Sequence, residues 1–204
     1  MPTYAKSTVT IANIFQAAEG LFTSKNYADV TMSHIAQAAN VTKGALYHHF
    51  SGKEDLYLRM MHNFLDEIHA LTADSVQNSA TRPCRQRLHC FTLSFLTLPD
   101  IQQKLMRLVR RDINTFTDPE REVLVRAYQR ALPEQAETII RDGIANGEIE
   151  GTDARLLSWE HVAIVEVVLR PYAQNALGDP QNIADFVIKL FFDGVGRCTF
   201  HYGN

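Results

Sequence analysis

Two threonines in the segment TMSHIAQAANVTKGALYHHFSGKEDL (residues 31–56) lie where each could bind a phosphate group. Thr31 and Thr42 each precede a short apolar-periodic run, which predicts that both are N-caps of short helices. A helix N-terminus presents a hydroxyl and free backbone N–H groups, and its dipole favours an anion. Phosphate contacts of this kind set the register of a protein on a DNA duplex.

The residues after Thr42 are suited to approach the edges of bases. Lys43, Gly44 and Ala45 form the first turn of the expected second helix, where small residues let the backbone come close to a base. We expect Lys43 to make the direct base contact, with Ser33 reaching a base from the preceding helix. The alternative for Lys43 is a solvated surface lysine.

Three helices must position these residues. Apolar residues recur at three and four positions over 8–24, and short helices are expected over 31–39 and 42–50. Because only Asn40 and Val41 separate the short helices, these must cross steeply. Asn40 occupies the turn position that needs a left-handed backbone, and Ala36 lies where the helices come closest. The expected core of this pair is Ile35, Ala39, Val41 and Leu46.

The segment resembles the signature of the TetR family in its order and register. The matching residues are Ile35-Ala36, Val41, Thr42-Lys43-Gly44, Tyr47-His48-His49-Phe50 and Lys53-Glu54-Asp55-Leu56. Asn40 departs from the pattern, since the family usually has glycine there. The resemblance implies an N-terminal three-helix helix-turn-helix domain (residues 1–53), followed by an effector-binding and dimerisation domain (54–204) that starts with a linking helix over about 53–78.

The resemblance also implies roles for residues that follow the first turn of the second short helix, which is the recognition helix of the family. Tyr47, His48 and Lys53 resemble residues that clamp the DNA backbone. The alternative for Lys53 is a solvated surface lysine, and the alternative for Tyr47 is packing against the neighbouring helix. His49 fits packing and DNA contact equally, whereas Phe50 is expected to pack.

The rest of the chain has helical periodicity and almost no strand-like alternation, so the fold class is all-α. We expect a bundle of about five helices after a connector near 78–83. The expected segments lie near 83–98, 100–116, 119–147, 152–177 and 181–198. Pro133 should interrupt the third segment, and Gly147 is expected to end a helix.

One helix-turn-helix contacts only a few base pairs, so specificity requires two copies on palindromic double-stranded operator DNA. We therefore expect a homodimer. The last helices carry apolar residues around more than half their circumference, although such stripes are more often core than interface. The expected interface residues are Ala163, Ile164, Val167, Val168, Phe186, Val187, Leu190, Phe191 and Gly194.

The resemblance implies a small-molecule effector that binds among the helices near 83–98, 100–116 and 119–132. The expected ligand-binding residues are His89, Phe91, Phe95, Met106, Val109, Arg110, Asn114 and Tyr128. Ordinary bundle core is the alternative for each of them. The function expected is a repressor that an effector releases from its operator. A DNA-binding activator, or a nucleoid or cell-division factor without an inducer, remains an alternative.

The composition of the chain limits which classes of protein it can belong to. A net charge of -3 requires DNA binding to come from a local patch rather than from the whole chain. The three cysteines include no CxxC pair, and the sequence has neither a signal peptide nor a long apolar run, so we expect a cytoplasmic protein without a membrane segment. We predict no catalytic residue, cofactor or metal. A metal sensor using Cys84, His89 and Cys90 is a weak alternative, as is an enzyme.

Overall fold

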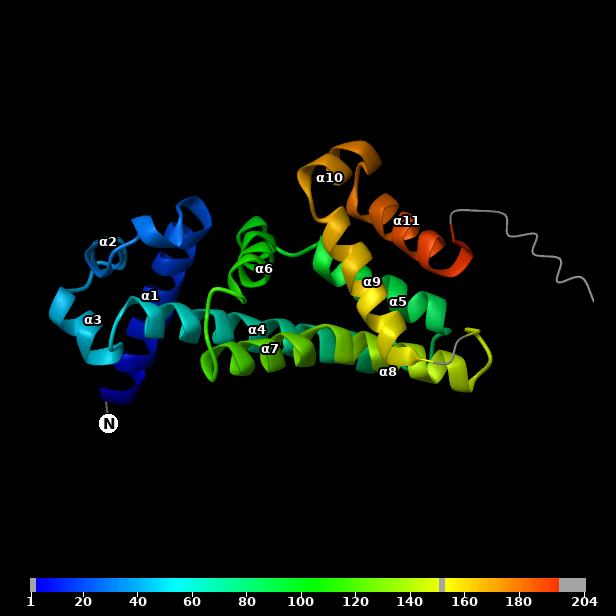
Figure 1. Ribbon diagram of the computed structural model, residues 1–204, viewed down its shortest axis with the longest axis horizontal. Helices are drawn as coiled ribbons and strands as arrows, with labels where there is room; N and C mark the ends of the chain where they lie inside the picture. Colours follow the sequence, from blue (N-terminus) through cyan, green and yellow to red (C-terminus); the bar gives the residue numbers. More distant parts are fainter. Residues whose placement is uncertain (1–2, 151–152, 195–204) are drawn as a thin grey trace, which may run out of the picture. The chain divides into compact units, whose positions relative to one another are not determined.

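The computed structural model of the chain describes residues 3–150 and 153–194. Within these ranges every regular element is a helix and no strand occurs, which confirms the all-α prediction (Figure 1). None of the helices described combines the length and the apolar character that crossing a membrane requires. The chain divides into two compact units, Met1–Glu67 with Pro99–Tyr128 (unit 1) and Ile68–Leu98 with Gln129–Asn204 (unit 2).

Unit 1 begins with the three helices that the sequence predicted. Its elements are α1 (Thr3–Ser24), the short 3-10 helix η1 (Tyr27–Asp29), α2 (Met32–Ala38), α3 (Lys43–His49), the first part of α4 (Lys53–Asn78), α6 (Asp100–Asp112) and most of α7 (Glu120–Ala131). The first helix starts at Thr3 rather than residue 8, because no glycine or proline in 3–19 stops it.

The turn between α2 and α3 has the predicted backbone. Asn40 has a φ of 52°, and the Val41 N–H donates to the Ala36 carbonyl over 2.9 Å. Ile35 and Leu46 are fully buried, as expected. The prediction that Ala39 and Val41 belong to this core was wrong: both are only half-buried, because they flank the turn at the edge of the helix pair.

Helices α4 and α6 are joined inside unit 1 by a buried polar group. The Tyr57 hydroxyl donates a hydrogen bond to Asp112, and the Arg111 guanidinium reaches the same carboxylate over 2.8 Å. Burial acts to raise the pKa of Asp112, but the hydrogen bonds from Arg111 and Tyr57 outweigh it and hold that pKa below its usual value. The carboxylate therefore stays charged and paired.

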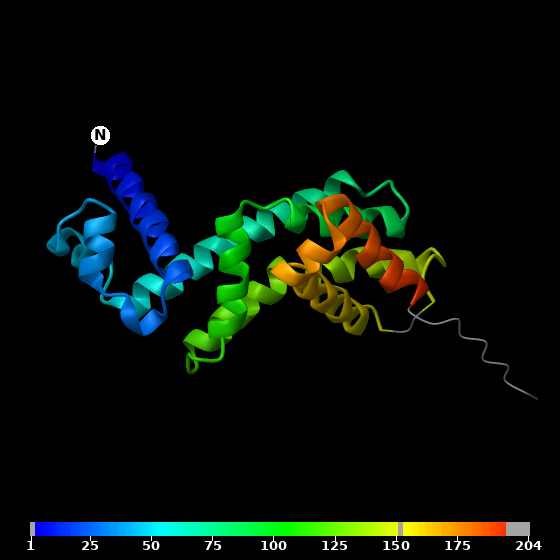
Figure 2. The same ribbon diagram turned by 90° about the horizontal axis from the view of Figure 1, so that it is seen from above.

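Unit 2 contains the remainder of α4 and α7 together with five further helices (Figures 1 and 2). These are α5 (Cys84–Leu96), α8 (Pro133–Ala145), α9 (Ala154–Val168), α10 (Pro171–Leu177) and α11 (Pro180–Asp193). Helix α5 packs against α8 and α11, and α9 packs against α8, α10 and α11.

Prolines account for the difference from the expected helix count. Pro133 starts α8, as predicted, because proline has no N–H and its ring clashes with the preceding turn. Pro171 starts α10 in the same way, so the expected single segment over 152–177 is two helices. Within the described residues seven helices, α5 to α11, follow the connector rather than about five. The last predicted segment ends at Asp193, and its residues 195–198 lie outside the described ranges.

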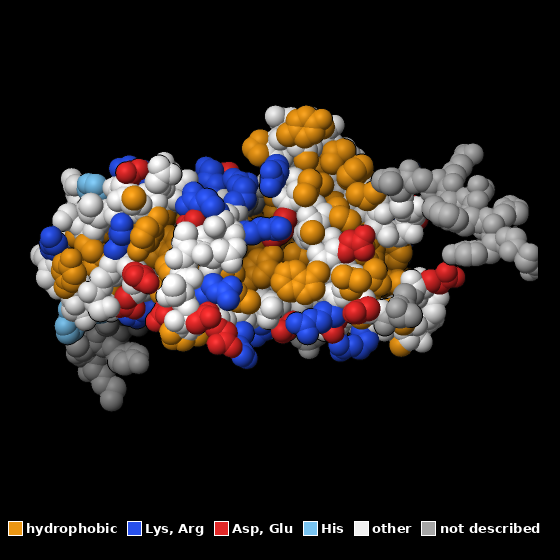
Figure 3. All heavy atoms as spheres, viewed as in Figure 1, with side chains coloured by type: hydrophobic (Ala, Val, Ile, Leu, Met, Phe, Trp, Pro, Cys, Tyr) orange, Lys and Arg blue, Asp and Glu red, His pale blue; other side chains and the backbone are white. Residues whose placement is uncertain are grey.

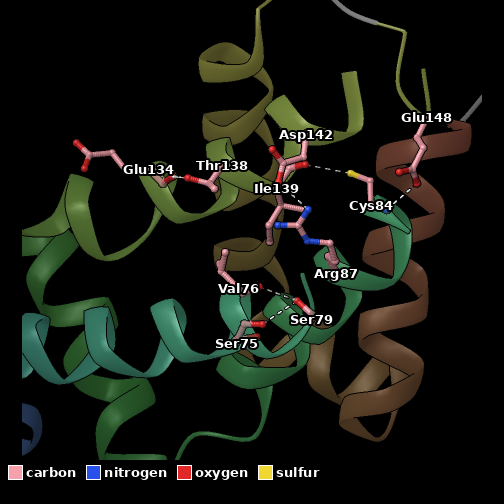
Figure 4. A network of polar contacts seen from close by, with 10 residues as sticks. All are labelled: Ser75, Val76, Ser79, Cys84, Arg87, Glu134, Thr138, Ile139, Asp142 and Glu148. Atoms are coloured by element: carbon pink, nitrogen blue, oxygen red, sulfur yellow. Dashed lines mark hydrogen bonds and ion pairs between the residues drawn. The ribbon is translucent and has the colours of Figure 1, made fainter. Parts of the chain in front are cut away.

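The start of α5 is tied to the end of α8 (Figure 4). Gly147 has a φ of 72°, and the Glu148 N–H donates to the Gly143 carbonyl over 2.8 Å, which confirms that Gly147 ends this helix. The Glu148 carboxylate then accepts from the Cys84 N–H at 2.6 Å, at the N-terminus of α5. Arg87 adds an ion pair to Asp142 at 2.8 Å.

Candidate nucleic-acid interface

The first turn of α3 is exposed and capped. The Thr42 hydroxyl accepts a hydrogen bond from the Ala45 N–H at 3.1 Å, and Lys43 and Gly44 are exposed. A Cβ placed on Gly44 would meet nothing closer than the Thr42 Oγ1 at 4.0 Å, and its φ is not positive. The fold itself therefore does not require glycine at position 44, and there is open space beside this exposed residue.

The side chains after this turn differ in how far they are exposed. Tyr47 is 48% exposed, and the Lys43 ammonium lies 5.9 Å from the centre of its ring. His48 is exposed and His49 is half-buried. Phe50 is buried, with its ring centre 5.8 Å from that of Phe15, so the prediction that Phe50 packs is confirmed.

The N-terminus of the preceding helix, α2, is also capped and exposed to solvent. The Thr31 hydroxyl accepts from the His34 N–H at 3.2 Å, and the His34 Nδ1 accepts from the Thr31 N–H at 3.3 Å. This is a capping box in which histidine replaces the usual glutamate or glutamine. Thr31 and Ser33 are both exposed.

Two contacts with Tyr27 hold the Lys53 side chain in place. Its ammonium donates to the Tyr27 carbonyl at 2.8 Å and lies 4.1 Å from the centre of the Tyr27 ring. The side chain is half-buried, which contradicts the alternative of a freely solvated lysine. Because an ammonium has three donors, two hydrogens of Lys53 are left for an anion.

Arg59, on α4, completes this surface and was not predicted. Its guanidinium donates to the His49 carbonyl at 2.8 Å and lies 4.7 Å from the centre of the Phe50 ring. The carbonyl is one of the unpaired acceptors at the C-terminus of α3, so Arg59 closes the end of that helix. No local sequence pattern could have shown this contact, since it joins two helices.

The eight residues predicted to bind the effector are divided between the two units. His89, Phe91 and Phe95 belong to unit 2, and Met106, Val109, Arg110, Asn114 and Tyr128 belong to unit 1. Phe91 and Phe95 are buried with ring centres 5.0 Å apart. Of the residues in unit 1, Arg110 and Asn114 are exposed and the other three are buried.

His89 lies at the surface instead of in the core. It contacts Asp185 at 3.0 Å and Gln181 at 3.1 Å, and it lines an open hollow of about 420 Å³ between α5 and α11. Cys90 shares this hollow, whereas Cys84 is buried. Residues 3–150 and 153–194 contain no group of three or more His, Cys, Asp or Glu side chains able to hold a metal.

The predicted dimer residues also differ in exposure. Val167 is 58% and Phe186 43% exposed, and Ala163 and Gly194 are exposed as well. Ile164, Leu190 and Phe191 are half-buried. Val168 and Val187 are buried inside unit 2, so their assignment to the interface was wrong: each faces the core of its own chain.

Helices α2 and α3 are short and joined by a tight turn. The first turn of α3 is capped and exposed to solvent. These features define a helix-turn-helix DNA-binding protein. Residues 14–60 match the family described as bacterial regulatory proteins, tetR family. Residues 81–195, more than half of the chain, match the tetracyclin repressor-like C-terminal domain. The chain belongs to the TetR family, whose members are transcriptional regulators rather than enzymes.

Similar proteins include the HTH-type transcriptional regulator TtgR of Pseudomonas putida, 26% identical over 86% of this chain and 88% of that protein. Among solved structures, FadR from Bacillus subtilis in complex with stearoyl-CoA has a TM-score of 0.77 and 19% identity, covering 91% of this chain and 99% of that one. AibR in complex with isovaleryl coenzyme A and operator DNA has a TM-score of 0.74 and 20% identity, covering 90% of this chain and 98% of that one.

Proposed function

We propose that this regulator is a repressor that binds palindromic operator DNA as a homodimer and leaves it when a small-molecule effector binds. The observation that carries the DNA-binding part is the geometry at the start of α3. There a capped helix N-terminus stands beside an exposed lysine and a glycine that the fold does not require. We expect such a regulator in the cytoplasm, where its DNA is.

Each side chain of the interface has a proposed role. The N-termini at Thr31 and Thr42 bind phosphates, and Lys43 reads a base edge in the major groove. Tyr47, which lies beside Lys43, and His48 are both exposed and bind backbone phosphates, and Lys53 adds its two remaining donors. Ser33, Gly44, Ala45 and His49 complete the predicted contact set, with Gly44 allowing close approach. Phosphate contacts supply affinity, whereas base contacts supply sequence preference.

Exposed apolar side chains support a dimer through α9 and α11. Leu156 is 65% exposed, Val167 58% and Phe186 43%, and Tyr172 on α10 is 84% exposed. Figure 3 shows hydrophobic side chains gathered over this part of unit 2. Apolar area of this kind marks contact surfaces, and a two-fold pairing of α9 and α11 would cover Ala163, Val167 and Phe186.

Two structural neighbours support an effector with an apolar part. FadR and AibR were each solved with an acyl-coenzyme A, and AibR also with operator DNA. We propose an effector of the same broad kind for this chain. It must bind a DNA-incompetent state more tightly, and a coupling of about 1–3 kcal/mol would change operator affinity about 5- to 150-fold. Helix α4 supplies residues to both units, and we propose that a change in its tilt transmits effector binding to the DNA-binding helices.

Selection of binding sites from a random duplex library, at a stated near-physiological salt concentration, tests this proposal. A palindromic consensus is expected, with half-sites spaced by about 34 Å or a multiple of it. The selected duplex then becomes the probe in a fluorescence anisotropy titration with acyl-coenzyme A compounds. Failure of the folded protein to enrich any sequence over competitor DNA would overturn operator binding. A consensus without two-fold symmetry would overturn the dimer.

A further inference from the structure

His161 is a fully buried polar side chain in unit 2 that the DNA-binding function does not use. It lies on α9, and its Nε2 is 3.0 Å from the Thr92 hydroxyl on α5. Its Nδ1 is also buried and finds no hydrogen-bond partner among the described residues. A buried polar atom without a partner is uncommon and costly in folded proteins, so its presence calls for a physical explanation.

The tautomer of the His161 ring sets the direction of its hydrogen bond with Thr92, because either the hydroxyl or an Nε2–H can donate in this contact. Thr92 is fully buried, and within the described part of the chain the only hydrogen-bond partner of its hydroxyl is the His161 ring. We assign the hydroxyl as the donor to Nε2, because the opposite direction would leave two buried polar sites unused, the hydroxyl hydrogen and the Nδ1 lone pair, instead of the Nδ1 hydrogen alone. Burial lowers the pKa of His161 to about 4, so the ring is neutral at pH 7. A neutral ring that accepts at Nε2 carries its hydrogen on Nδ1, which leaves an unused donor.

Aromatic rings surround this donor. The ring centre of His161 lies 5.1 Å from that of Phe191 on α11 and 6.1 Å from that of Phe91 on α5. Phe95 extends the cluster along α5. Phe91 and Phe95 are buried, whereas Phe191 is half-buried. Phe191 is thus the ring of this cluster that is partly open to solvent, and a molecule that reached His161 would meet apolar side chains around its ring.

We propose that His161 is the polar anchor of the effector site, where its Nδ1–H donates to a carbonyl oxygen of a predominantly apolar acyl compound. This inference rests on the proposed effector response and names the chemistry of its ligand. Sites for such ligands are mostly apolar, with a few polar groups that fix orientation. Phe91 and Phe95, predicted from the sequence to line the site, lie in this cluster, whereas His89 lies at the surface and is not the anchor.

A core histidine that merely bonds Thr92 is the competing explanation, and three variants separate the two. His161→Phe removes both ring nitrogens and keeps an aromatic ring of similar size. His161→Asn places an amide donor near the position of Nδ1 but cannot reach Thr92 as Nε2 does. Thr92→Val removes the hydroxyl and keeps the ring of His161.

The experiment measures release of the selected operator duplex by octanoyl-coenzyme A and palmitoyl-coenzyme A, with coenzyme A alone as the control. For the parent protein we expect release by at least one acyl compound and a raised Tm. His161→Phe should need at least tenfold more of that compound while binding the operator normally. His161→Asn should stay within about threefold of the parent, because it keeps a donor, and Thr92→Val should lie between them.

Nitrogen-15 NMR of the imidazole gives a readout that a structural role would not move. The free protein should show the hydrogen on Nδ1, and the acyl compound should shift that resonance. Equal release of the parent and His161→Phe would overturn the anchor while leaving the repressor proposal intact. If neither acyl compound releases the operator or raises the Tm, the ligand chemistry proposed for His161 is wrong. Loss of operator binding in the parent protein itself would instead contradict the proposed function.

Discussion

The Arg59 guanidinium donates a hydrogen bond to the main-chain carbonyl of His49 over 2.8 Å, so a residue of α4 closes the C-terminus of α3. Arg59 also covers the ring of Phe50, which packs against Phe15 of α1. The orientation of α3 thus depends on a side chain that need not contact DNA.

Replacing Arg59 with alanine should weaken operator binding without changing which sequence is preferred. The His49 carbonyl at the helix end loses its donor, and a hydrogen bond is worth about 1 kcal/mol, which corresponds to roughly fivefold in affinity. Anisotropy titrations with the selected duplex and with single-base variants check this. Arg126→Ala, which removes an exposed arginine paired with Glu122 on α7, is the matched control. Equal affinities of the two variants would contradict the role of Arg59.

Lys43→Ala should weaken operator binding by about 1–3 kcal/mol and relax the preference at one base pair. The reason is that Lys43 is exposed beside the capped N-terminus of α3, where a side chain can reach a base edge. Lys53→Ala is the comparison, because a phosphate contact should weaken all sequences alike and lower the salt dependence. If Lys43→Ala weakens every duplex equally, Lys43 binds phosphate instead.

Gly44→Ala should leave the fold intact and still reduce DNA binding. Apart from its chain neighbours and the backbone of its own helix, the added methyl meets no atom closer than 4.0 Å, and alanine favours a helix over glycine by about 1 kcal/mol. Thermal unfolding should therefore show an unchanged or raised Tm. Anisotropy should show at least severalfold weaker binding, because the methyl lies on the exposed side. Unimpaired binding would mean that the backbone at position 44 does not approach DNA closely.

Gly143→Ala should destabilise unit 2. A Cβ at this position would lie 2.6 Å from the Cys84 Sγ and 2.9 Å from the Cys84 Cβ, at the junction of α5 and α8. Such overpacking costs about 1–3 kcal/mol, measurable by urea unfolding. Gly20→Ala is the control, since nothing lies within 4 Å of its added Cβ and the helix should gain slightly in stability. A Gly143→Ala protein as stable as the parent would show that α5 and α8 can separate freely.

Because His161 is buried, the free energy of unfolding should decrease as the pH falls. Its folded pKa is lowered to about 4 from 6.5, so below pH 6.5 the unfolded chain takes up a proton that the folded chain does not. Stability should decline between pH 6.5 and 4 by about 3 kcal/mol from this residue alone. His161→Phe should flatten that decline, whereas Thr92→Val, which keeps the ring, should retain it. Parallel pH profiles of the parent and His161→Phe would contradict the burial of a neutral ring.

Features set by neighbouring residues could be predicted from the sequence. The caps at Thr31 and Thr42 and the left-handed Asn40 all occur where expected, because capping and turn geometry depend on residues three or four positions apart. The end of a helix at Gly147 follows from the same local rules. Pro171 obeys them too, since it starts α10 inside the segment 152–177 that periodicity predicts as one. The division of function at residue 53 and the roles of the site residues stay predictions.

Contacts between distant residues could not be predicted. The His161–Thr92 pair joins positions 69 apart, and the bond from the Cys84 N–H to Glu148 joins positions 64 apart. Burial of Val168 and Val187 likewise depends on which face of α9 and α11 meets other helices. Periodicity shows that a helix has an apolar face, but core and dimer surfaces share that pattern. The sequence therefore determined the DNA-reading helix pair, whereas tertiary packing decided which apolar and polar side chains remain available to a partner or a ligand.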